Sequence, residues 1–355
     1  MTTLAEDYDF VIGGDPDRDT VDLAALDTGT GLVQAHLADA ADGGGYRRML
    51  LWAGEHAPSR RIWALEGTGS FAAGLVVFLL EAGETVVEVG ALKRARGAKN
   101  DRIGAIRAAR QALARDELGA PRAGGLREAL RMVFACREGV LVSRTKAINE
   151  LKSLIVVAPE ELRAQLRGRS LATQLVRIEH LQTGPVVPVV HRLSVLILQS
   201  VTARVRFLSG QLAGLDPQLL ELIKQHPAGP ALLAETGVGP VAAAQLLISW
   251  SHHGRVRNEA AFASLAGVSP LETSSGQHSR HRLNRGGDRA LNRALHTVAV
   301  TRMRCHPETR TYEARRSSEG KTHRDIRRSL KRSLAWRLYR TIEAAVRTRD
   351  VAIAA

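Results

Sequence analysis

The sequence is poor in cysteine, in aromatic residues and in long apolar runs. It has two cysteines in 355 residues, and aromatic side chains make up 4% of the chain. Cys136 and Cys305 lie in unrelated contexts, which excludes a disulfide scaffold and a thiolate zinc site and fits a reducing cytosol. The apolar run from Phe71 to Leu80 is too short to span a bilayer, and the N-terminus has no basic-then-apolar signal pattern. We therefore expect a cytoplasmic protein of two or three domains with no membrane-spanning segment.

Acidic residues are scarce in the last part of the chain, and basic residues are scarce in the first. Residues 1–92 carry 15 acids against 5 bases, a net charge of −10, whereas residues 277–350 carry 20 Lys and Arg against 7 acids, a net charge of +13. A basic surface of this size favours polyanions, because each phosphate contact releases condensed counterions. The alternative is a solvated basic surface that serves solubility. Since the bases cluster with Gly, Ser and Asn, the pattern favours nucleic acid.

The first hundred residues predict strands and helices in the order β-β-β-α-β-α-β-α, which is how an RNase H-like fold begins. A hairpin turn signal, Asp27-Thr28-Gly29-Thr30-Gly31, separates the second and third strands. Asn100 is a good cap for the last helix. The predicted strands are Phe10–Gly13, Val21–Leu26, Leu32–Leu37, Arg61–Leu65 and Thr85–Val89, and the predicted helices are Gly45–Glu55, Phe71–Ala82 and Asp101–Leu113.

The remainder of the chain predicts helices. Residues 118–124 mark a boundary, after which apolar residues recur at three- and four-residue spacing in long segments joined by Gly and Pro breaks. This pattern indicates a helical hairpin or coiled coil, and an ordinary helical bundle fits it equally well. Further on, Gly237-Val238-Gly239-Pro240 resembles the turn of a helix-hairpin-helix element, which holds a DNA phosphate, although a plain helix–helix turn also explains it.

Three acidic residues fall on elements that the predicted fold brings together. Asp15 and Glu66 come at the ends of the first and fourth strands, which lie side by side in an RNase H-like sheet, and Asp101 is on a helix over the same edge. Hard oxygen ligands of this kind suit Mg²⁺ or Mn²⁺. Asp17 and Asp19 are equivalent candidates beside Asp15, and Asp101 also suits a helix cap. Residue 104, one turn from Asp101, would face the same site, but it is glycine and supplies no ligand.

A second group of residues surrounds two serines. Thr273-Ser274-Ser275-Gly276 opens a segment dense in arginine, in which Gly276 would allow the backbone to approach a phosphate closely. Arginines can clamp the non-bridging oxygens of a phosphate, and cations stabilise the charge that develops when a serine attacks. Without its basic context, a Ser-Ser-Gly segment is an ordinary flexible linker. The arginines predicted to bind nucleic acid are Arg280, Arg282, Arg285 and Arg289, together with the turn glycines Gly237 and Gly239.

Several of these motifs, taken in order, resemble the IS110 insertion-sequence transposases, relatives of the pilin-gene invertases. They are Thr68-Gly69 after Glu66, the run Lys99–Ile103, Gly237–Pro240, Phe262–Pro270, Ser275-Gly276 and Asn284–Gly287. The resemblance covers nearly the whole chain. It implies a RuvC-like metal-binding nuclease domain (residues 1–120), a coiled-coil domain (121–225) and a mainly helical transposase domain with a serine nucleophile (226–355).

The resemblance also implies roles for individual residues and partners. The family has four metal-binding acids, which fall on Asp15, Glu66, Asp101 and Gly104, so this chain lacks the fourth. The catalytic serine falls on Ser275, with Ser274 as the fallback. The implied partners are donor and target DNA, a structured bridge RNA that pairs with both, and further copies of the chain in a dimer or tetramer. The expected function is therefore an RNA-guided DNA recombinase or transposase that uses Mg²⁺.

Two other functions remain open from the sequence. One is a metal-dependent junction nuclease resembling RuvC, in which water replaces serine as the nucleophile. The other is a catalytically impaired transposase copy that still binds nucleic acid, an alternative that Gly104 supports.

Overall fold

The computed structural model describes residues 4–90, 101–114, 118–122, 124–184, 187–272, 281–282, 284 and 286–354. The chain forms two compact units. Unit 1 comprises Met1–Arg127 and Trp250–Phe262, and unit 2 comprises Glu128–Ser249 and Ala263–Ala355. Unit 1 is a mixed α/β structure, and unit 2 is almost entirely helical. The division into three domains that the sequence suggests stays a prediction.

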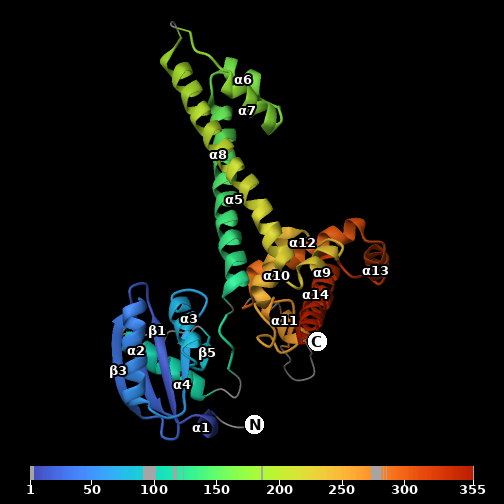
Figure 1. The fold of residues 1–355 in the computed structure, drawn as a ribbon. Helices are drawn as coiled ribbons and strands as arrows, with labels where there is room; N and C mark the ends of the chain where they lie inside the picture. Colours follow the sequence, from blue (N-terminus) through green and yellow to red (C-terminus); the bar gives the residue numbers. More distant parts are fainter. Residues whose placement is uncertain are drawn as a thin grey trace. The chain divides into compact units, whose positions relative to one another are not determined.

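Unit 1 is built on a five-stranded sheet in the order β3-β2-β1-β4-β5 (Figure 1). The first three strands form an antiparallel meander, and β1, β4 and β5 are parallel neighbours. The predicted order of elements is confirmed. β1 runs further than its apolar residues indicate, through Asp15 to Pro16, because pairing with β2 continues to that point. The strands are β1 (Phe10–Pro16), β2 (Thr20–Asp27), β3 (Val33–Ala40), β4 (Arg61–Glu66) and β5 (Val86–Val89).

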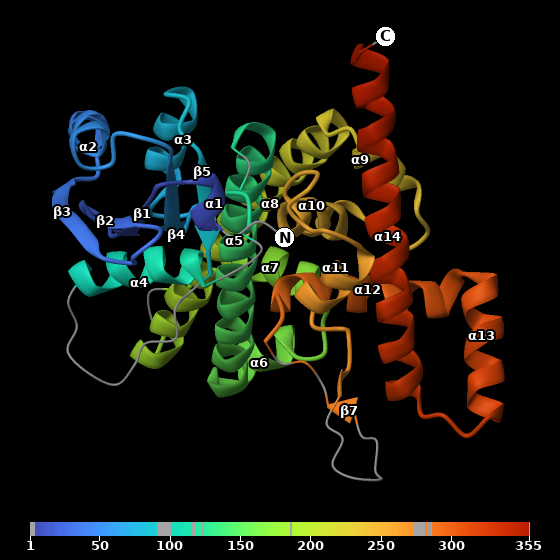
Figure 2. The ribbon, with the colours of Figure 1, turned by 90° about the horizontal axis from the view of Figure 1, so that it is seen from below.

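Helices cover both faces of this sheet, as Figure 2 shows. Helices α2 (Gly43–His56) and α3 (Ala73–Glu81) pack on one face, and α4 (Asp101–Leu113) packs on the other; a short helix, α1 (Leu4–Asp7), precedes the sheet. Alternate strand residues enter the two cores because successive side chains of a strand point to opposite faces. The α2/α3 core contains Ile12, Leu23, Trp63 and Leu65, whereas the α4 core contains Val11, Ala24, Ile62 and Ala64.

The approach of α4 to the sheet depends on small residues. The face that α4 buries consists of Ala105, Ala108, Ala109 and Ala112. At the point of closest approach β1 has Gly13, where an added Cβ would lie 2.5 Å from the backbone nitrogen of Ala109 and would overlap the carbonyl oxygen of Ala105. This contact brings the first turn of α4 over the ends of β1 and β4.

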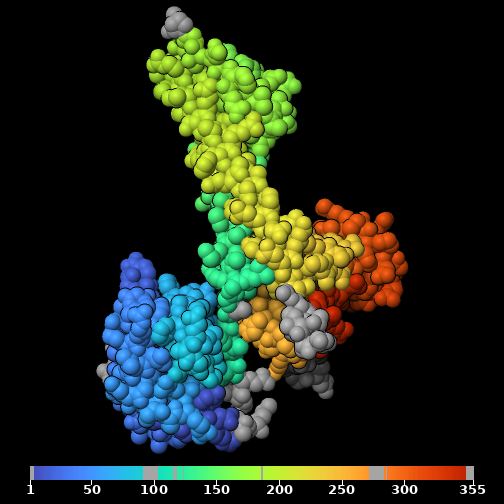
Figure 3. Space-filling model, viewed as in Figure 1, coloured from blue at the N-terminus to red at the C-terminus, as the bar shows by residue number. Residues whose placement is uncertain are grey.

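Two long antiparallel helices, α5 (Gly125–Val157) and α8 (Val189–Gln225), form most of the first half of unit 2. Polar contacts join them along their length: Arg137 to Asp216, Arg144 to Ser209, and Arg204 to Glu150. Helices α6 (Glu160–Leu166) and α7 (Leu171–Glu179) widen the far end of this hairpin (Figure 3) and share its apolar core. The helical hairpin predicted from the sequence is confirmed.

The second half of unit 2 packs around α12 (Arg289–Cys305) and α14 (His323–Ala354), which contact each other. Their buried faces include Leu291, Leu295 and Val298 on α12, and Leu334, Leu338 and Ile342 on α14. Among the described residues, no helix combines the length and the apolarity needed to cross a membrane. The remaining elements are α9 (Gly229–Ala234), α10 (Pro240–Trp250), α11 (Glu259–Leu265), β6 (Leu271–Glu272), β7 (His281–Arg282) and α13 (Pro307–Ser318).

Candidate functional site

Asp15 and Glu66 lie side by side at one edge of the sheet. β1 and β4 are parallel, and their register pairs Gly13 with Ala64 and Gly14 with Leu65. The next residue of each strand is therefore Asp15 and Glu66. The carboxyl ends of parallel neighbours meet at this edge, so the juxtaposition predicted from the sequence is confirmed for these two acids.

Both acids belong to the face of the sheet that α4 covers. Gly13 and Ala64, two residues earlier on each strand, face α4, and the strand period of two carries the same orientation on to Asp15 and Glu66. The side chain of Asp15 lies beneath residue 104 of α4, since an ideal Cβ built on Gly104 would overlap Asp15 Oδ2 and lie 2.6 Å from Asp15 Cγ. The glycine at position 104 thus leaves room for the Asp15 carboxylate.

The other acids named from the sequence have different outcomes. Asp101 is the first residue of α4, as predicted, but its side chain lies outside the described residues. Asp17 and Asp19 belong to the exposed turn between β1 and β2, where the side chain of Asp17 accepts a hydrogen bond from the backbone of Arg18 and Asp19 pairs with the Arg18 guanidinium. These local contacts favour Asp15 over its two neighbours as the acid of the site.

One further acid, Asp22, shares this face and was missed by the sequence argument. It pairs with Asp15 across the antiparallel β1–β2 ladder, and Ala24, two residues along β2, is in the α4 core. Residues directly opposite in a ladder point to the same face. The signal was present in the alternation of Val21–Leu26, where Asp22 is a polar residue among those that face α4.

Three carboxylates thus share one face, but they do not by themselves form a cage for a metal. Among the described side chains, which do not include that of Asp101, no group of three or more His, Cys, Asp and Glu is close enough to hold an ion. The donor set consists of carboxylate oxygens, which suit a hard divalent cation that keeps several waters and completes its shell with phosphate. Asp15 and Glu66 fit such a cation, with Asp101 as the ligand expected from α4.

An ion-pair network lies on the opposite face of β5. Glu88 pairs with Leu65 in the ladder and therefore points away from Glu66. Its carboxylate accepts a hydrogen bond from Arg255 at 3.1 Å and lies 3.5 Å from Arg122. Burial lowers the pKa of His252, and the positive charges of Arg255 and Arg127 lower it further. Arginine charge therefore surrounds this part of unit 1, including the segment Trp250–Phe262.

The Thr68-Gly69 motif after β4 holds Arg122. Thr68 is almost fully buried, and its hydroxyl accepts a hydrogen bond from the backbone nitrogen of Arg122 at 3.3 Å. A Cβ at position 69 would lie 2.7 Å from Arg122 Cδ, so the arginine side chain packs directly over this glycine. The motif thus has a structural role beside the acidic edge.

The serine segment is described at its two ends only. Ser274, Ser275, Arg280 and Arg285 lie outside the described residues, and so does the side chain of Arg282; Arg289 is exposed at the start of α12. The ends are joined by the short β6–β7 ladder, in which Leu271 pairs with Arg282. The acids belong to unit 1, and the described ends of the serine segment belong to unit 2.

The residues that flank the serine segment make close backbone contacts and hydrogen bonds with α11 and α12. Gly267 has a φ of +65°. A Cβ at Gly287 would overlap the backbone nitrogen of Gly267, so the absence of side chains lets the backbone before the segment contact the backbone after it. The backbone nitrogen of Asp288 donates to the carbonyl of Leu265 at 2.7 Å, and Asp288 caps α12. The amide of Asn292 donates to the carbonyl of Ala266 at 2.7 Å. The described residues on both sides of the segment are therefore tied to α11 and α12.

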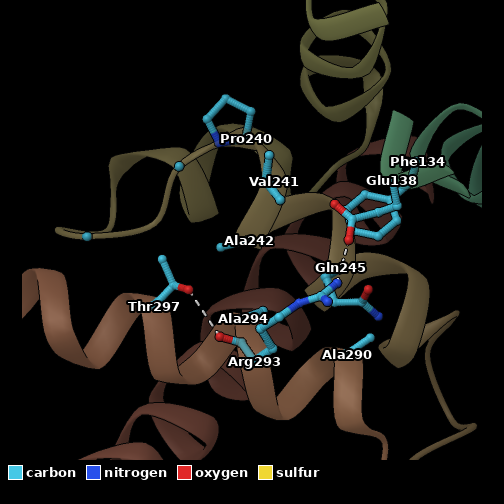
Figure 4. Close-up of a pocket in the computed structure, with 12 residues that line it drawn as sticks. Phe134, Glu138, Pro240, Val241, Ala242, Gln245, Ala290, Arg293, Ala294 and Thr297 are labelled. Carbon is cyan, nitrogen blue, oxygen red and sulfur yellow. Dashed lines mark hydrogen bonds and ion pairs between the residues drawn. The ribbon is translucent and has the colours of Figure 1, made fainter. Parts of the chain in front are cut away.

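The turn between α9 and α10 contains the two glycines Gly237 and Gly239, and its role as a helix-hairpin-helix element stays a prediction. Gly237 has a φ of +85° and packs against α12, where a Cβ would lie 3.1 Å from Arg302 Cγ. A Cβ at Gly239 would meet no described atom within 4 Å, so this glycine is open to a close approach. Both line a pocket of about 230 Å³ between the first turn of α10 and α12. Figure 4 shows Arg293 reaching Glu138 across this pocket, an ion pair of 2.5 Å.

Two transposase family models match this chain in separate parts. A transposase model matches residues 12–158, and the model of the transposase IS116/IS110/IS902 family matches residues 230–314. An uncharacterized 43.6 kDa protein of insertion element IS110 from Streptomyces coelicolor is 35% identical over 130 residues, which are 36% of this chain and 32% of that protein. An uncharacterized 42 kDa protein of insertion element IS900 from Mycobacterium paratuberculosis is 26% identical over 319 residues, with coverage of 74% and 77%. The first match thus spans about a third of that relative's length.

Proposed function

The chain belongs to the IS116/IS110/IS902 transposase family, and we propose that it is a DNA recombinase that cuts and rejoins strands through a serine nucleophile and a carboxylate-bound divalent metal. The observation that carries the proposal is the pairing of Asp15 and Glu66 at one sheet edge, under the first turn of α4. The acids lie in one family match and the serine segment in the other, so both functional groups fall in matched parts of the chain.

The acidic edge would hold the cation. Asp15 and Glu66 would supply oxygens from neighbouring strands, and Asp101, the first residue of α4, would supply another. A bound Mg²⁺ or Mn²⁺ would polarise a phosphate and stabilise the reacting oxygens. The sheet fixes the spacing of the first two ligands, because both come directly after ladder-paired residues.

The serine segment would supply the nucleophile. Ser275 Oγ forms an ester bond to phosphorus while the bond from phosphorus to the leaving deoxyribose oxygen breaks. The serine proton is lost to solvent, and the leaving oxygen takes up a proton. In the rejoining step a strand hydroxyl attacks the phosphoserine and regenerates the serine, so the number of bonds to phosphorus is unchanged. The held ends at Gly267 and Gly287 support this role by fixing where the segment begins and ends.

The remaining parts of the proposal concern partners. DNA backbone would contact the open Gly239 turn and the arginines around α12, and a structured bridge RNA would select donor and target sites. The α5–α8 hairpin, acting as a coiled coil, would join copies of the chain into a dimer or tetramer in the cytoplasm. The basic charge of residues 277–350 supports nucleic-acid binding of either kind.

Trapping a covalent protein–DNA adduct tests the serine mechanism. The unaltered protein, incubated with DNA, bridge RNA and Mg²⁺, is expected to form an adduct that survives denaturation, and Ser275→Ala is expected to abolish it. Ser274→Ala is the matched control and should retain it. Loss in Ser274→Ala alone would move the nucleophile by one residue. Cleavage without an adduct in any variant would replace the proposal with a metal-dependent junction nuclease that uses water.

A second candidate function is a nucleic-acid-binding transposase copy with impaired catalysis. Gly104 favours it, because the fourth acid of the family pattern is absent and the Asp15 carboxylate occupies the adjoining space. This candidate predicts binding to DNA and RNA without strand exchange, and no adduct with the unaltered protein.

A further inference from the structure

Helices α12 and α14 pack against each other (Figure 2). Basic side chains of both helices form a cluster close to this contact. Asn292 and His296 are one turn apart on α12, and Arg327 and Lys331 are one turn apart on α14. Lys331 Nζ donates to Asn292 Oδ1 at 2.8 Å, which places the ammonium between the helices. None of these residues is among the arginines that the sequence argument assigned to nucleic acid.

The charges in this cluster are poorly compensated. Arg328 Nη1 lies 3.3 Å from Asp325, which is exposed, whereas Arg327 Nε donates to the backbone carbonyl of His323. In the described part of the chain, no carboxylate lies within ion-pair distance of Lys331 or Arg327. Cations that are gathered in this way repel one another, and a half-buried ammonium also loses part of its hydration.

The directions of the pKa shifts of Lys331 and His296 agree with this geometry. Burial lowers the pKa of Lys331, and the charges of Arg328 and Arg327 lower it further. Burial also lowers the pKa of His296, with Lys331 and Arg327 as the next causes. A solvated basic face would be expected to spread its charges, whereas here two helices bring them together and an amide oxygen holds the central one.

We propose that the α12–α14 cluster of His296, Arg327, Arg328 and Lys331 is a binding site for one phosphodiester of a nucleic-acid backbone. This deepens the proposed function by adding a phosphate contact that is separate from the serine segment. Guanidinium groups match phosphate oxygens in a fork, and Lys331 adds a point charge between them. A contact to a phosphodiester positions a strand and carries no sequence information directly, so this site would hold a backbone of any sequence.

The cluster is attached to the base of the serine segment. Asn292 accepts from Lys331 and donates to the carbonyl of Ala266, the residue before Gly267. A phosphate held at Lys331 is therefore linked by two hydrogen bonds to the point where that segment leaves α11. This link would fix a bound strand relative to the segment.

Salt-dependent binding of the full chain tests this site, with no strand exchange required. The probes are a labelled duplex DNA of arbitrary sequence and an RNA hairpin of equal length. Lys331→Met preserves the length of the side chain and removes its charge. It is expected to reduce the log–log salt slope by about one unit and to weaken binding roughly fivefold at physiological salt, as expected for one lost phosphate contact.

Two control variants make this result specific. Lys331→Arg keeps the charge and should retain the slope. Lys152→Met removes an exposed lysine of α5 in the same unit and should leave the slope unchanged. Loss of slope on DNA alone, on RNA alone or on both probes identifies which backbone occupies the site. An unchanged slope and affinity on both probes in Lys331→Met would overturn the proposal.

A second measurement does not depend on a substitution at Lys331. An anion beside His296 stabilises its imidazolium, so binding of the duplex or the hairpin should raise the pKa of His296. Nuclear magnetic resonance follows this titration, and His296→Gln assigns the signal. A pKa of His296 that stays the same with both probes bound would contradict the site. Failure of the serine mechanism would leave both measurements unaffected, which separates the two proposals.

Discussion

The two units place their charged groups by different physical means. In unit 1, Asp15 and Glu66 follow ladder-paired residues of neighbouring strands, so hydrogen bonding between strands sets their separation. In unit 2, Arg327 and Lys331 stand on a helix surface, and their neighbours depend on how α14 packs against α12. A strand ladder therefore fixes a pair of side chains locally, whereas a helix surface leaves the choice of partner to tertiary packing.

The comparison also concerns charge compensation. Several acids of unit 1 are matched by arginines: Asp9 by Arg60, Asp39 by Arg48, and Glu84 by two nitrogens of Arg61. Among the described residues, Lys331 and Arg327 of the α12–α14 cluster have no carboxylate partner, and Arg328 contacts the exposed Asp325. The difference separates charges that stabilise the fold from charges left for a ligand.

The largest expected effect tests whether strand exchange depends on Asp15, which lies beside Glu66 at the sheet edge, more than on Asp17 in the adjoining turn. Asp15→Asn should reduce strand exchange about a thousandfold, because it would remove a charge from the proposed metal-binding edge and several kcal/mol of metal stabilisation with it. Asp17→Asn is the control with the same chemical change in the adjoining turn and should remain close to unaltered activity. Rates of recombination measured in parallel decide the point, and equal losses in the two variants would contradict the assignment.

A smaller effect tests charge compensation within unit 1. Burial raises the pKa of Glu84, but hydrogen bonds from Arg61 and Trp63 outweigh it, and the pKa lies below its ordinary value of 4.5. A carboxyl with a lowered folded pKa stabilises the fold above its unfolded pKa, and this stabilisation is lost as the pH falls through the folded value. Glu84→Gln should therefore lower the free energy of unfolding by about 2–3 kcal/mol at neutral pH and by less in acid.

Denaturant unfolding across a pH series measures this difference. Glu81→Gln, at an exposed position of α3, is the matched control and should change the free energy of unfolding by less than about 0.5 kcal/mol. A Glu84→Gln effect that is the same at neutral and acid pH would show that packing, and not charge, accounts for the loss.

The smallest expected effect concerns the missing fourth acid. Residue 104 faces Asp15, as the hypothesis of a fourth ligand requires, and any side chain there forces the Asp15 carboxylate to move. Gly104→Ala adds the Cβ without a ligand, so it isolates the steric cost. Gly104→Asp should bind Mg²⁺ several-fold more tightly than Gly104→Ala, because hard-cation affinity rises with the number of carboxylate oxygens.

The Mg²⁺ concentration that gives half-maximal strand exchange is measured for the unaltered protein, Gly104→Ala and Gly104→Asp. Equal values for the Ala and Asp variants would mean that a carboxylate at position 104 does not reach the cation. An Asp variant that also exchanges strands faster than the unaltered protein would support the view that Gly104 limits this copy.

Sequence reasoning predicted the sheet well because its signals are local. Alternation and the turn Asp27–Gly31 identified the meander, and the parallel β1–β4 pair followed from the order of elements. It missed Asp22, whose place opposite Asp15 depends on register. It also gave no boundary for α14, where many Lys, Arg and other polar residues obscure the apolar spacing of Ile326, Leu334 and Leu338.

The sequence by itself determined the chemistry: acids at strand ends, a serine among arginines, and a basic C-terminal part. Tertiary structure decided which groups meet. It set Asp15 beneath Gly104 through the contact of Gly13 with α4, and it brought Lys331 to Asn292 and thereby to Ala266. The physical reason is the separation along the chain over which each kind of interaction acts. Propensity and periodicity act over a few neighbouring residues, whereas the packing of a helix against a sheet or another helix joins positions tens of residues apart.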